Sequence, residues 1–536
     1  MRRVLTASDR ALLVEEDDLE AAMRLQAALV AAALPGVEEL IPAARTVLVR
    51  FDPTVATAAD LARRIAEVPP VADAAADAGS VVIPVRYGGE DLAEVAGLLG
   101  LSEDAVVARH VAATWRVAFT GYAPGFGYLV GDDPVFDVPR RSSPRTRIPA
   151  GSVGLAGHFS GVYPRESPGG WQLIGRTGAD MWDLRRDPPA LLAPGAVVRF
   201  ERADREVVTS APAPAAPAHD GPFAVEVVRP GLQLVIEDAG RPGNAALGVS
   251  ASGAADRRAL RRANRAVGNR LDEAAFELAG GGAVLRFRGA GAVAVAGAAM
   301  DPVLVRPDGT ELPLADGVPA AIEDGDELRL GPAREGLRAA IAVRGGLDLE
   351  PALGSLSSDT LAGLGVTEHG GAPLPAGAVV PLRGPAAAPD AVEAVPAPRA
   401  ALPVPGAVVD LRVALGPRDD WFTAAGVRTL LGQEWLVTPR SDRVGIRLEG
   451  ETPLERSVPG ELPSEGAVTG AIQVPPDGQP VLFLPDHPLT GGYPIIGAVI
   501  DADLDLAGQL PPGARIRFRA VSDPFSGDAG RGETGV

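Results

Sequence analysis

Two distant stretches of the chain repeat one pattern, and this repeat limits the folds open to it. Residues 169–175 read Gly-Gly-Trp-Gln-Leu-Ile-Gly, and residues 491–497 read Gly-Gly-Tyr-Pro-Ile-Ile-Gly. Each is followed within about twenty residues by Pro-Gly-Ala-x-x-Arg-Phe, which ends at Phe200 and at Phe518. A repeat of this size indicates several related small β barrels, each closed by a strand that enters through a Gly turn, better than one large sheet.

The composition supports many short strands separated by turns. The chain of 536 residues contains 65 Gly and 51 Pro, and a length of this order predicts roughly three or four domains. Ala/Pro-rich segments at 210–221 and 385–405 are predicted to be extended linkers. They divide the chain into sections at 1–209, 222–384 and 406–536, and we expect the first section to change from an α+β domain to a barrel at about residue 86.

The first 85 residues alternate in type and predict an α+β domain. We expect strands at 11–14, 37–41, 46–51 and 80–85, and helices at 19–33 and 57–65, with Thr57 as an N-cap. This β-α-β-β-α-β order is typical of the ferredoxin-like fold. A helical stretch at 91–110, broken at Gly100, follows before the barrel strands begin.

Charge and missing residue types exclude several functions. The formal net charge of −19 argues against a duplex nucleic acid or an anionic membrane as partner. The absence of Cys excludes disulfides and Cys-ligated metal sites, and no apolar run of roughly 18 residues is present, so we expect a cytoplasmic protein. All 50 Lys-or-Arg positions are Arg, so the chain cannot carry biotin or form a Schiff base, and any phosphate must meet Arg, backbone N–H groups or a metal.

The densest motif runs from residue 119 to 177 and interleaves aromatic, Gly and Arg residues. Aromatic faces, close backbone approach at Gly and the guanidinium forks of Arg can build a ligand pocket, but the same residues can also build tight barrel corners. Both interpretations stay open on the residues alone. The candidate binding residues are Tyr122, Phe126, Arg140, Arg145, Ser152, Tyr163, Ser167, Gly169, Gly170, Trp171 and Arg176.

This segment, with its Gly-Tyr-Ala-Pro-Gly-Phe-Gly-Tyr-Leu and Ser-Pro-Gly-Gly-Trp-Gln-Leu-Ile-Gly-Arg-Thr motifs, resembles the allophanate hydrolase subunit 1 family, also called the B-type subunits of 5-oxoprolinase. The resemblance covers about 10–205. Residues 222–522 resemble the companion family, allophanate hydrolase subunit 2 or the C-type subunits of 5-oxoprolinase, through Glu-Asp-Ala-Gly-Arg-Pro-Gly at 237–243, Gly-Val-Ser-Ala-Ser-Gly-Ala-Ala-Asp at 248–256 and Thr-Gly-Gly-Tyr-Pro at 490–494. Two departures from the family patterns lie at the loop 365–371 and at Phe159-Ser160.

The resemblance implies a mainly β fold with a ferredoxin-like domain followed by three cyclophilin-like barrels, one in the first half and two in the second. It implies a fused B/C component of an ATP-dependent 5-oxoprolinase, which activates the lactam for hydrolysis to glutamate together with a separate A-type subunit. ATP with Mg²⁺ is the expected cofactor. A carboxyltransferase role in urea use, with biotin supplied by another chain, and a regulatory module of the kinase-inhibitor type are the alternatives. Homo-oligomerisation stays open.

Single polar residues are weighed against structural roles. His110 is a candidate proton donor or a satisfied barrel histidine. Asp238 with Arg241 would bind a small amide or form a turn salt bridge, and Asp256 would line a pocket or cap a helix. Asp486 lies in a loop, where acids are more often functional than in the core. His158 and His487 are poor metal-ligand candidates because no ligand cluster surrounds them. The other candidate binding residues are Gln233, Asn264, Asn269, Asp442, Arg443, Arg447, Gln473, Thr490 and Tyr493.

Overall fold

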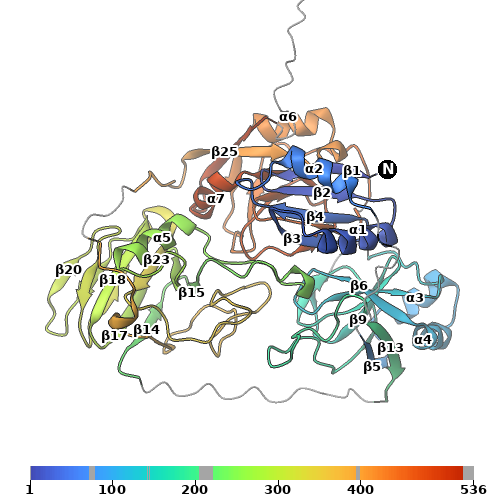
Figure 1. Cartoon of the computed structure of the whole chain (residues 1–536), viewed down its shortest axis with the longest axis horizontal. Helices are drawn as coiled ribbons and strands as arrows, with labels where there is room; N and C mark the ends of the chain where they lie inside the picture. The colour runs from blue at the N-terminus through green and yellow to red at the C-terminus, as the bar shows by residue number, and fades with distance from the viewer. Residues whose placement is uncertain are drawn as a thin grey trace, which may run out of the picture.

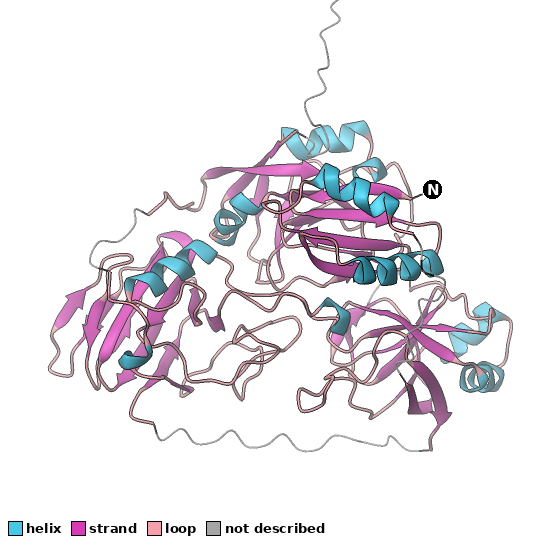
Figure 2. Cartoon of the chain, viewed as in Figure 1, coloured by secondary structure: helices cyan, strands magenta, loops and turns pink. Residues whose placement is uncertain are grey.

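A computed structural model describes residues 2–69, 71, 79–141, 143, 145–204, 221–393, 399–460 and 462–522. Strands dominate and the helices are few and short (Figure 2). The N-terminal sheet lies beside the C-terminal barrel, and below them the first barrel lies on one side of the view and the middle section on the other (Figure 1). The mainly β class is confirmed. Nearly all of the first predicted linker (210–220) and a short part of the second (394–398) fall outside the described residues.

The N-terminal sheet contains β1 (Arg3–Ser8), β2 (Ala11–Glu15), β3 (Val37–Pro42) and β4 (Thr46–Phe51) in the antiparallel order β1-β2-β4-β3. Helices α1 (Leu19–Ala32) and α2 (Ala58–Glu67) connect or follow these strands, and the Thr57 hydroxyl caps α2 by accepting from the Asp60 N–H. The expected ferredoxin-like order is wrong at one strand. The strand predicted at 80–85 pairs with the first barrel, and the unpredicted β1 fills the edge beside β2.

Both faces of this sheet are buried. Val47, Val49 and Phe51 face the two helices. Leu48 and its neighbours on the other face pack against Ala471, Phe483 and other residues of the C-terminal barrel. Strands that are covered on both faces have nearly continuous apolar sequences, and the Leu-Leu-Val and Val-Leu-Val runs of β2 and β4 have this character. The sheet is therefore fixed to the barrel most distant from it in sequence.

The first barrel closes in the order β5-β12-β9-β10-β7-β6-β13, with β5 and β13 parallel. Helices α3 and α4 and the two-stranded antiparallel sheet of β8 and β11 lie outside the barrel order. The bounds are β5 (Ser80–Tyr87), α3 (Leu92–Leu99), α4 (Glu103–Ala112), β6 (Trp115–Thr120), β7 (Gly127–Gly131), β8 (Arg145–Ile148), β9 (Ser152–Ala156), β10 (Phe159–Val162), β11 (Ser167–Gly169), β12 (Gln172–Arg176) and β13 (Val197–Arg202).

The second barrel closes in the equivalent order β25-β32-β29-β30-β27-β26-β33, with β25 and β33 parallel. The repeated sequences lie at β12 and β13 in the first barrel and at β32 and β33 in the second, so the predicted internal repeat is confirmed. The bounds are β25 (Val408–Leu415), η3 (Asp419–Trp421), α6 (Ala424–Gly432), β26 (Trp435–Val437), β27 (Gly445–Glu449), β28 (Glu465–Gly466), β29 (Ala471–Gln473), β30 (Val481–Phe483), β31 (Thr490–Gly491), β32 (Ile495–Val499), α7 (Asp501–Gly508) and β33 (Arg515–Ala520).

The middle section differs from the two closed barrels, because it consists of a six-stranded and a five-stranded sheet around one apolar core. The sheets have the orders β20-β19-β22-β17-β14-β24 and β15-β16-β23-β18-β21. The bounds are β14 (Ala224–Pro230), β15 (Gln233–Glu237), η1 (Ala245–Leu247), α5 (Arg257–Ala266), β16 (Ala275–Ala279), β17 (Ala283–Arg288), β18 (Gly291–Ala299), β19 (Val303–Val305), β20 (Glu311–Pro313), β21 (Ala320–Ile322), β22 (Glu327–Arg329), β23 (Glu335–Val343), β24 (Val379–Pro381) and η2 (Pro385–Ala387). Across the described ranges, no helix has the length and apolar character needed to span a membrane.

Candidate functional site

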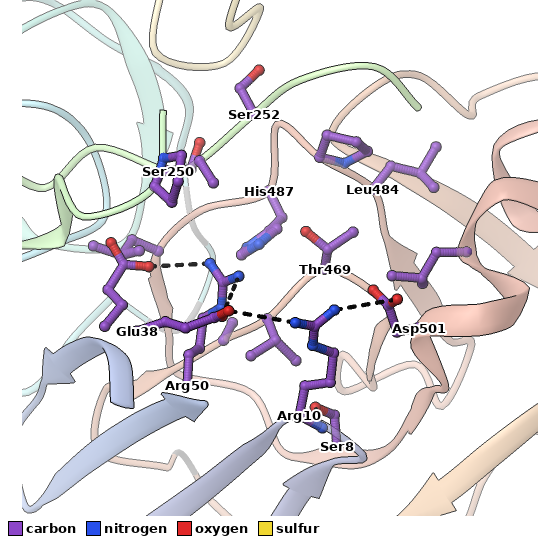
Figure 3. A pocket seen from close by; sticks show the side chains of 18 of the residues that line it. Ser8, Arg10, Glu38, Arg50, Ser250, Ser252, Thr469, Leu484, His487 and Asp501 are labelled. Atoms are coloured by element: carbon purple, nitrogen blue, oxygen red, sulfur yellow. Dashed lines mark hydrogen bonds and ion pairs between the residues drawn. The ribbon is translucent and has the colours of Figure 1, made fainter. Parts of the chain in front are cut away.

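A cavity of about 440 Å³ lies where the N-terminal sheet, the middle section and the second barrel meet (Figure 3). This volume falls within the range of small-molecule sites. The polar lining residues are Ser8, Asp9, Arg10, Glu38, Glu39 and Arg50 from the N-terminal sheet, Ser250, Ser252 and Arg257 from the middle section, and Thr469, His487 and Asp501 from the C-terminal barrel section. The cavity therefore exists only when the two halves of the chain are assembled.

The wall from the N-terminal sheet carries two arginines held by carboxylates. Arg50 on β4 faces Glu39 at 3.2 Å and Glu38 at 3.5 Å. Arg10, in the β1–β2 turn, faces Glu38 and Asp501, both at 3.4 Å. Figure 3 shows Glu38 between the two guanidinium groups. These contacts keep positive charge at the cavity wall while leaving both arginines about a third exposed.

His487 contributes an imidazole to the opposite wall. The ring is 6% exposed and stacks on Phe483 with an interplanar angle of 9°. Its Nδ1 lies 2.9 Å from the Pro488 carbonyl oxygen. Burial lowers the pKa of His487 to about 4, and the nearby positive charge of Arg50 also lowers it. The imidazole is therefore neutral near pH 7.

A loop between β15 and α5 brings two serines to the cavity. Ser252 adopts a left-handed backbone with φ of 52°, which is uncommon for a residue other than Gly and marks strain at functional sites. The Ser252 hydroxyl donates to Asp486 at 2.6 Å, and the Ser250 hydroxyl donates to Asp359 at 2.8 Å. Each serine thus connects the cavity to a buried carboxyl group.

The two carboxyl groups behind the serines differ in charge state. Asp486 forms a two-pronged ion pair with Arg443, and this guanidinium holds the pKa of Asp486 below its usual value against the opposing effect of burial. Burial and the neighbouring charge of Asp486 raise the pKa of Asp359 to about 7. An ionised acid and an acid that titrates near neutral pH therefore lie side by side, an arrangement typical of sites that use proton transfer.

Arg443 is the centre of this buried network. It is fully buried and donates to Asp486, to Glu277 and to the carbonyl oxygen of Gly253 at 2.8 Å. Glu237 lies 3.3 Å from Arg443, but neither of its carboxylate oxygens has a hydrogen-bond partner among the described residues. Burial raises the pKa of Glu237 well above its usual value and so favours its neutral form. The network joins the middle section to the second barrel.

Three of the residues predicted from the sequence meet in or beside this network: Arg241, Arg443 and Asp486. The Arg241 guanidinium is buried and donates to the Ser357 carbonyl oxygen, and its Nε and Nη1 have no hydrogen-bond partner among the described residues. For Arg443 the sequence predicts either a grip on an anion or a place on a solvated strand face. Its burial excludes the solvated face, and its partners are protein carboxylates.

Other predicted residues of the second half have structural roles. Asp238 accepts four hydrogen bonds within the middle section, from Gly240, Ser355, Leu356 and Ser357. Asp256 caps α5, and burial raises its pKa to about 6. Asn264 and Asn269 bond to each other and to backbone groups, Gln473 donates to the Tyr493 carbonyl, Asp442 accepts from its own turn, and Gln233 and Arg447 lie on β15 and β27 away from the cavity lining.

The predicted aromatic and Gly residues of the first half form a packed interior. Phe126, Tyr163 and Trp171 are buried and meet edge to face. Tyr122 donates to the Pro168 carbonyl oxygen, and burial raises its pKa to about 12. Gly169 has no room for a Cβ atom beside the Tyr163 hydroxyl. None of the predicted residues between 122 and 176 lines the 440 Å³ cavity, so the barrel-corner interpretation describes this segment better.

The remaining predicted binding residues of this segment, and Thr490 of the second half, form hydrogen bonds within the protein. Arg145 pairs with Asp91 through two short contacts, Arg140 donates to the Ser464 hydroxyl, and Thr490 accepts from the Tyr122 N–H. The Ser152 and Ser167 hydroxyls and Arg176 donate to backbone carbonyls, and the Gly170 carbonyl accepts from the Arg141 N–H. Arg140 and Thr490 thus join the first barrel to the second.

His110 is a core residue. It is fully buried among Tyr87, Trp115 and Phe200, and burial lowers its pKa to about 3. Its ring nitrogens contact the Tyr87 hydroxyl at 2.8 Å and the Ser160 hydroxyl at 3.1 Å. The His110 carbonyl accepts from the Trp115 indole, as the Leu430 carbonyl accepts from Trp435 in the second barrel. A Leu occupies the equivalent place there, so the position itself is structural and the proton-donor hypothesis loses its support.

None of the candidate site residues predicted from the sequence lines the cavity, and its lining residues Arg10, Arg50, Ser250, Ser252 and Asp501 were not predicted. A signal for Arg50 was present, because it is a charged residue at the end of an apolar strand whose faces are both covered. The departures at 365–371 and at Phe159-Ser160 do not touch the cavity lining. Within the described ranges, no group of three or more His, Asp or Glu side chains is arranged to hold a metal ion.

Comparison with known proteins divides the chain in the same way. Residues 2–192 match the family model "Carboxyltransferase domain, subdomain C and D", and residues 247–520 match "Carboxyltransferase domain, subdomain A and B". The crystal structure of TTHA0988 is 35% identical with a TM-score of 0.79, covering 95% of this chain and 99% of that one. The similarity therefore extends over both halves and their relative arrangement.

Curated relatives match one half each or a part of a larger protein. The 5-oxoprolinase B-type subunit of Bacillus subtilis is 40% identical over 185 residues, which cover 31% of this chain and 76% of that protein. The 5-oxoprolinase C-type subunit of Escherichia coli is 32% identical over 299 residues, covering 55% of this chain and 90% of that protein. Urea amidolyase of Saccharomyces cerevisiae is 32% identical over 317 residues, covering 56% of this chain and 17% of that enzyme.

Proposed function

Because the chain belongs to the carboxyltransferase-domain family and joins a half similar to the B-type subunits to a half similar to the C-type subunits, we propose that it is the fused B/C component of an ATP-dependent 5-oxoprolinase. It would bind 5-oxoproline and activate the lactam for hydrolysis to glutamate, together with a separate A-type subunit. The observation that carries the proposal is the 440 Å³ cavity, whose walls come from both halves.

The cavity suits a small, singly charged ligand. Its lining contains three arginines, Arg10, Arg50 and Arg257, and four acids, Asp9, Glu38, Glu39 and Asp501. A triphosphate carries more negative charge than these arginines can balance beside the four acids, whereas a single carboxylate needs only Arg10 and Arg50 as partners. We therefore propose that the lactam occupies this cavity and that ATP, with Mg²⁺, acts in the complex with the A-type subunit. The arginines would hold the substrate carboxylate, and the serines with their buried carboxyls would face the lactam group.

The test is reconstitution of the reaction. The purified chain and its A-type subunit together should release glutamate and phosphate from 5-oxoproline and ATP, and either protein alone should not. Arg50→Gln should raise the KM for 5-oxoproline by about tenfold or more, because it removes one charged partner of the carboxylate. Absence of turnover with the correct A-type subunit would overturn the proposal.

A second candidate is a carboxyltransferase role in urea use. It is favoured by the similarity to urea amidolyase, although the matched region is 17% of that enzyme. Because this chain has no lysine, the carboxybiotin would have to come from another protein. Carboxyl transfer from free carboxybiotin to urea by the purified chain would support this role over the first.

A further inference from the structure

Arg10 and Arg50, on the wall formed by the N-terminal sheet, have longer ion-pair distances than Arg257 on the facing wall. All four ion-pair distances of Arg10 and Arg50 lie between 3.2 and 3.5 Å. Arg257, on the facing wall, contacts Asp501 at 2.8 Å and Asp505 at 3.0 Å. Tight charge-assisted hydrogen bonds measure about 2.7–2.9 Å, so Arg10 and Arg50 keep donor capacity for a further anion while Arg257 is already engaged.

The protonation of His487 is fixed by its own backbone. A carbonyl oxygen only accepts hydrogen bonds, so the 2.9 Å contact with Pro488 requires the proton to be on Nδ1. In a neutral ring Nε2 then carries a lone pair and acts as an acceptor. No donor from the described part of the chain reaches Nε2, and the ring points toward the Arg50 guanidinium at the cavity (Figure 3). The charged groups near the ring are Arg50, which disfavours its protonation, and Asp486, which favours it.

We propose that this cavity recognises a small carboxylate that also carries an N–H group, with Arg10 and Arg50 binding the carboxylate and Nε2 of His487 accepting the N–H. The inference rests on the proposed function and names the atoms by which its substrate class is chosen. In 5-oxoproline the ring N–H and the carboxylate are on adjacent atoms, so one ligand presents both groups to one side of the cavity.

The same geometry predicts which ligands should bind weakly. An analogue with a ring oxygen in place of the N–H would set a lone pair against the lone pair of Nε2 and leave that nitrogen unsatisfied. A site built to accept a hydrogen bond discriminates strongly against a ligand that lacks the donor. An analogue without the carboxylate would leave Arg10 and Arg50 with only their loosely held protein partners.

Isothermal titration calorimetry on the full chain tests this recognition with three ligands: 5-oxoproline, the corresponding lactone acid and 2-pyrrolidinone. We expect 5-oxoproline to bind at least about tenfold more tightly than either analogue. In His487→Phe, which keeps a ring to stack on Phe483, the preference over the lactone acid should fall to within about threefold. Arg50→Gln should weaken both acids alike and preserve their ratio. Arg24→Gln, on the outer helix α1, is the matched control and should change nothing.

Each result has a distinct meaning. Equal binding of 5-oxoproline and the lactone acid by the wild type would overturn the recognition while leaving the proposed function intact. An unchanged preference in both His487→Phe and His487→Gln would overturn the role of His487. Failure of all three ligands to bind, while the complex with the A-type subunit turns over 5-oxoproline, would show that this cavity is not the lactam site. Failure of both binding and turnover would refute the proposed function itself.

Discussion

Replacing Arg443 with Met tests whether the buried network joins the middle section to the second barrel. Met has a similar length but no charge, so the variant removes the guanidinium and leaves the buried carboxyls of Asp486, Glu277 and Glu237 in place. Burial raises the pKa of Glu237 and so already favours its neutral form. Glu277 keeps the Ala255 N–H at 2.8 Å and a contact to Arg338 at 3.5 Å. The main cost of the substitution is therefore that the buried, ionised Asp486 loses its ion-pair partner.

The magnitude follows from the groups that remain. Removing one partner of a buried ion pair costs about 3–5 kcal/mol, because the other charge stays buried. Asp486 keeps hydrogen bonds from the Ser252 hydroxyl and from the N–H and hydroxyl of Thr360. We therefore expect the lower end, about 3 kcal/mol, which corresponds to roughly a hundredfold faster amide exchange by local opening.

Hydrogen exchange of the amides in β27 and β30, read by peptide mass spectrometry, measures this opening. In the wild type the pKa of Asp486 is lowered, so its stabilising effect is present above its unfolded pKa of about 3.9 and is lost as pH falls through the folded value. Without Arg443 its pKa rises, so the gap between variant and wild type should shrink as pH falls from 7 toward 4. Arg447→Met, on the exposed side of β27, is the control and should shift exchange by less than about threefold. A gap below about 1 kcal/mol at pH 7, or one that does not change with pH, would refute the reasoning.

Three further predictions concern other buried positions. His110→Leu copies Leu430 of the second barrel. Because Tyr87 and Ser160 lose a hydrogen-bond partner, the variant should be about 1–3 kcal/mol less stable in urea unfolding. Turnover of the complex should stay within about twofold of wild type, and a hundredfold loss would instead indicate a catalytic role for His110. Glu237→Gln should be within about 1 kcal/mol of wild type near pH 5 and more stable than wild type at pH 8 by thermal unfolding, because a group with a raised folded pKa loses stability as pH rises; a less stable variant at pH 8 would contradict this. Leu48→Ala should cost about 2–5 kcal/mol in urea unfolding, whereas the exposed Val30→Ala should cost under about 0.5 kcal/mol, and equal effects would argue against the packing of the sheet on the barrel.

Local patterns in the sequence were sufficient for most elements of the fold. The Thr57 cap, the break at Gly100 and the repeated closing strands all lie where they were expected, because each is determined by residues close to it in the sequence. The assignment of strand 80–85 to the first sheet failed, because strand pairing is decided by contacts distant in sequence. Its partner β13 begins at Val197, and the edge it was expected to fill is taken by β1 through a two-residue turn.

The site was predicted less completely for the same reason. Arg443 was a candidate from a family motif and Asp486 from its place in a loop, and the structure brings the two side chains together. The cavity itself combines Arg10 with His487 and Asp501, which lie near opposite ends of the chain, and no local pattern joins them. His110 and the aromatic segment lie in packed interiors away from the cavity, because conspicuous aromatic and Gly patterns also arise where a barrel must pack tightly.

The docking of the N-terminal sheet on the most distant barrel sets the order in which the protein can mature on the ribosome. The apolar face around Leu48 is synthesised first, and Ala498, the last residue of the same apolar cluster, emerges roughly 450 residues later, which takes about 20–90 seconds at about 5–20 residues per second. During that interval the four-stranded sheet exposes its apolar face to solvent, as a newly synthesised separate subunit would before it binds its partner. In this single chain the partner half is synthesised in a one-to-one ratio and is covalently tethered, so the exposed apolar face of the first half is covered by the later part of the same chain.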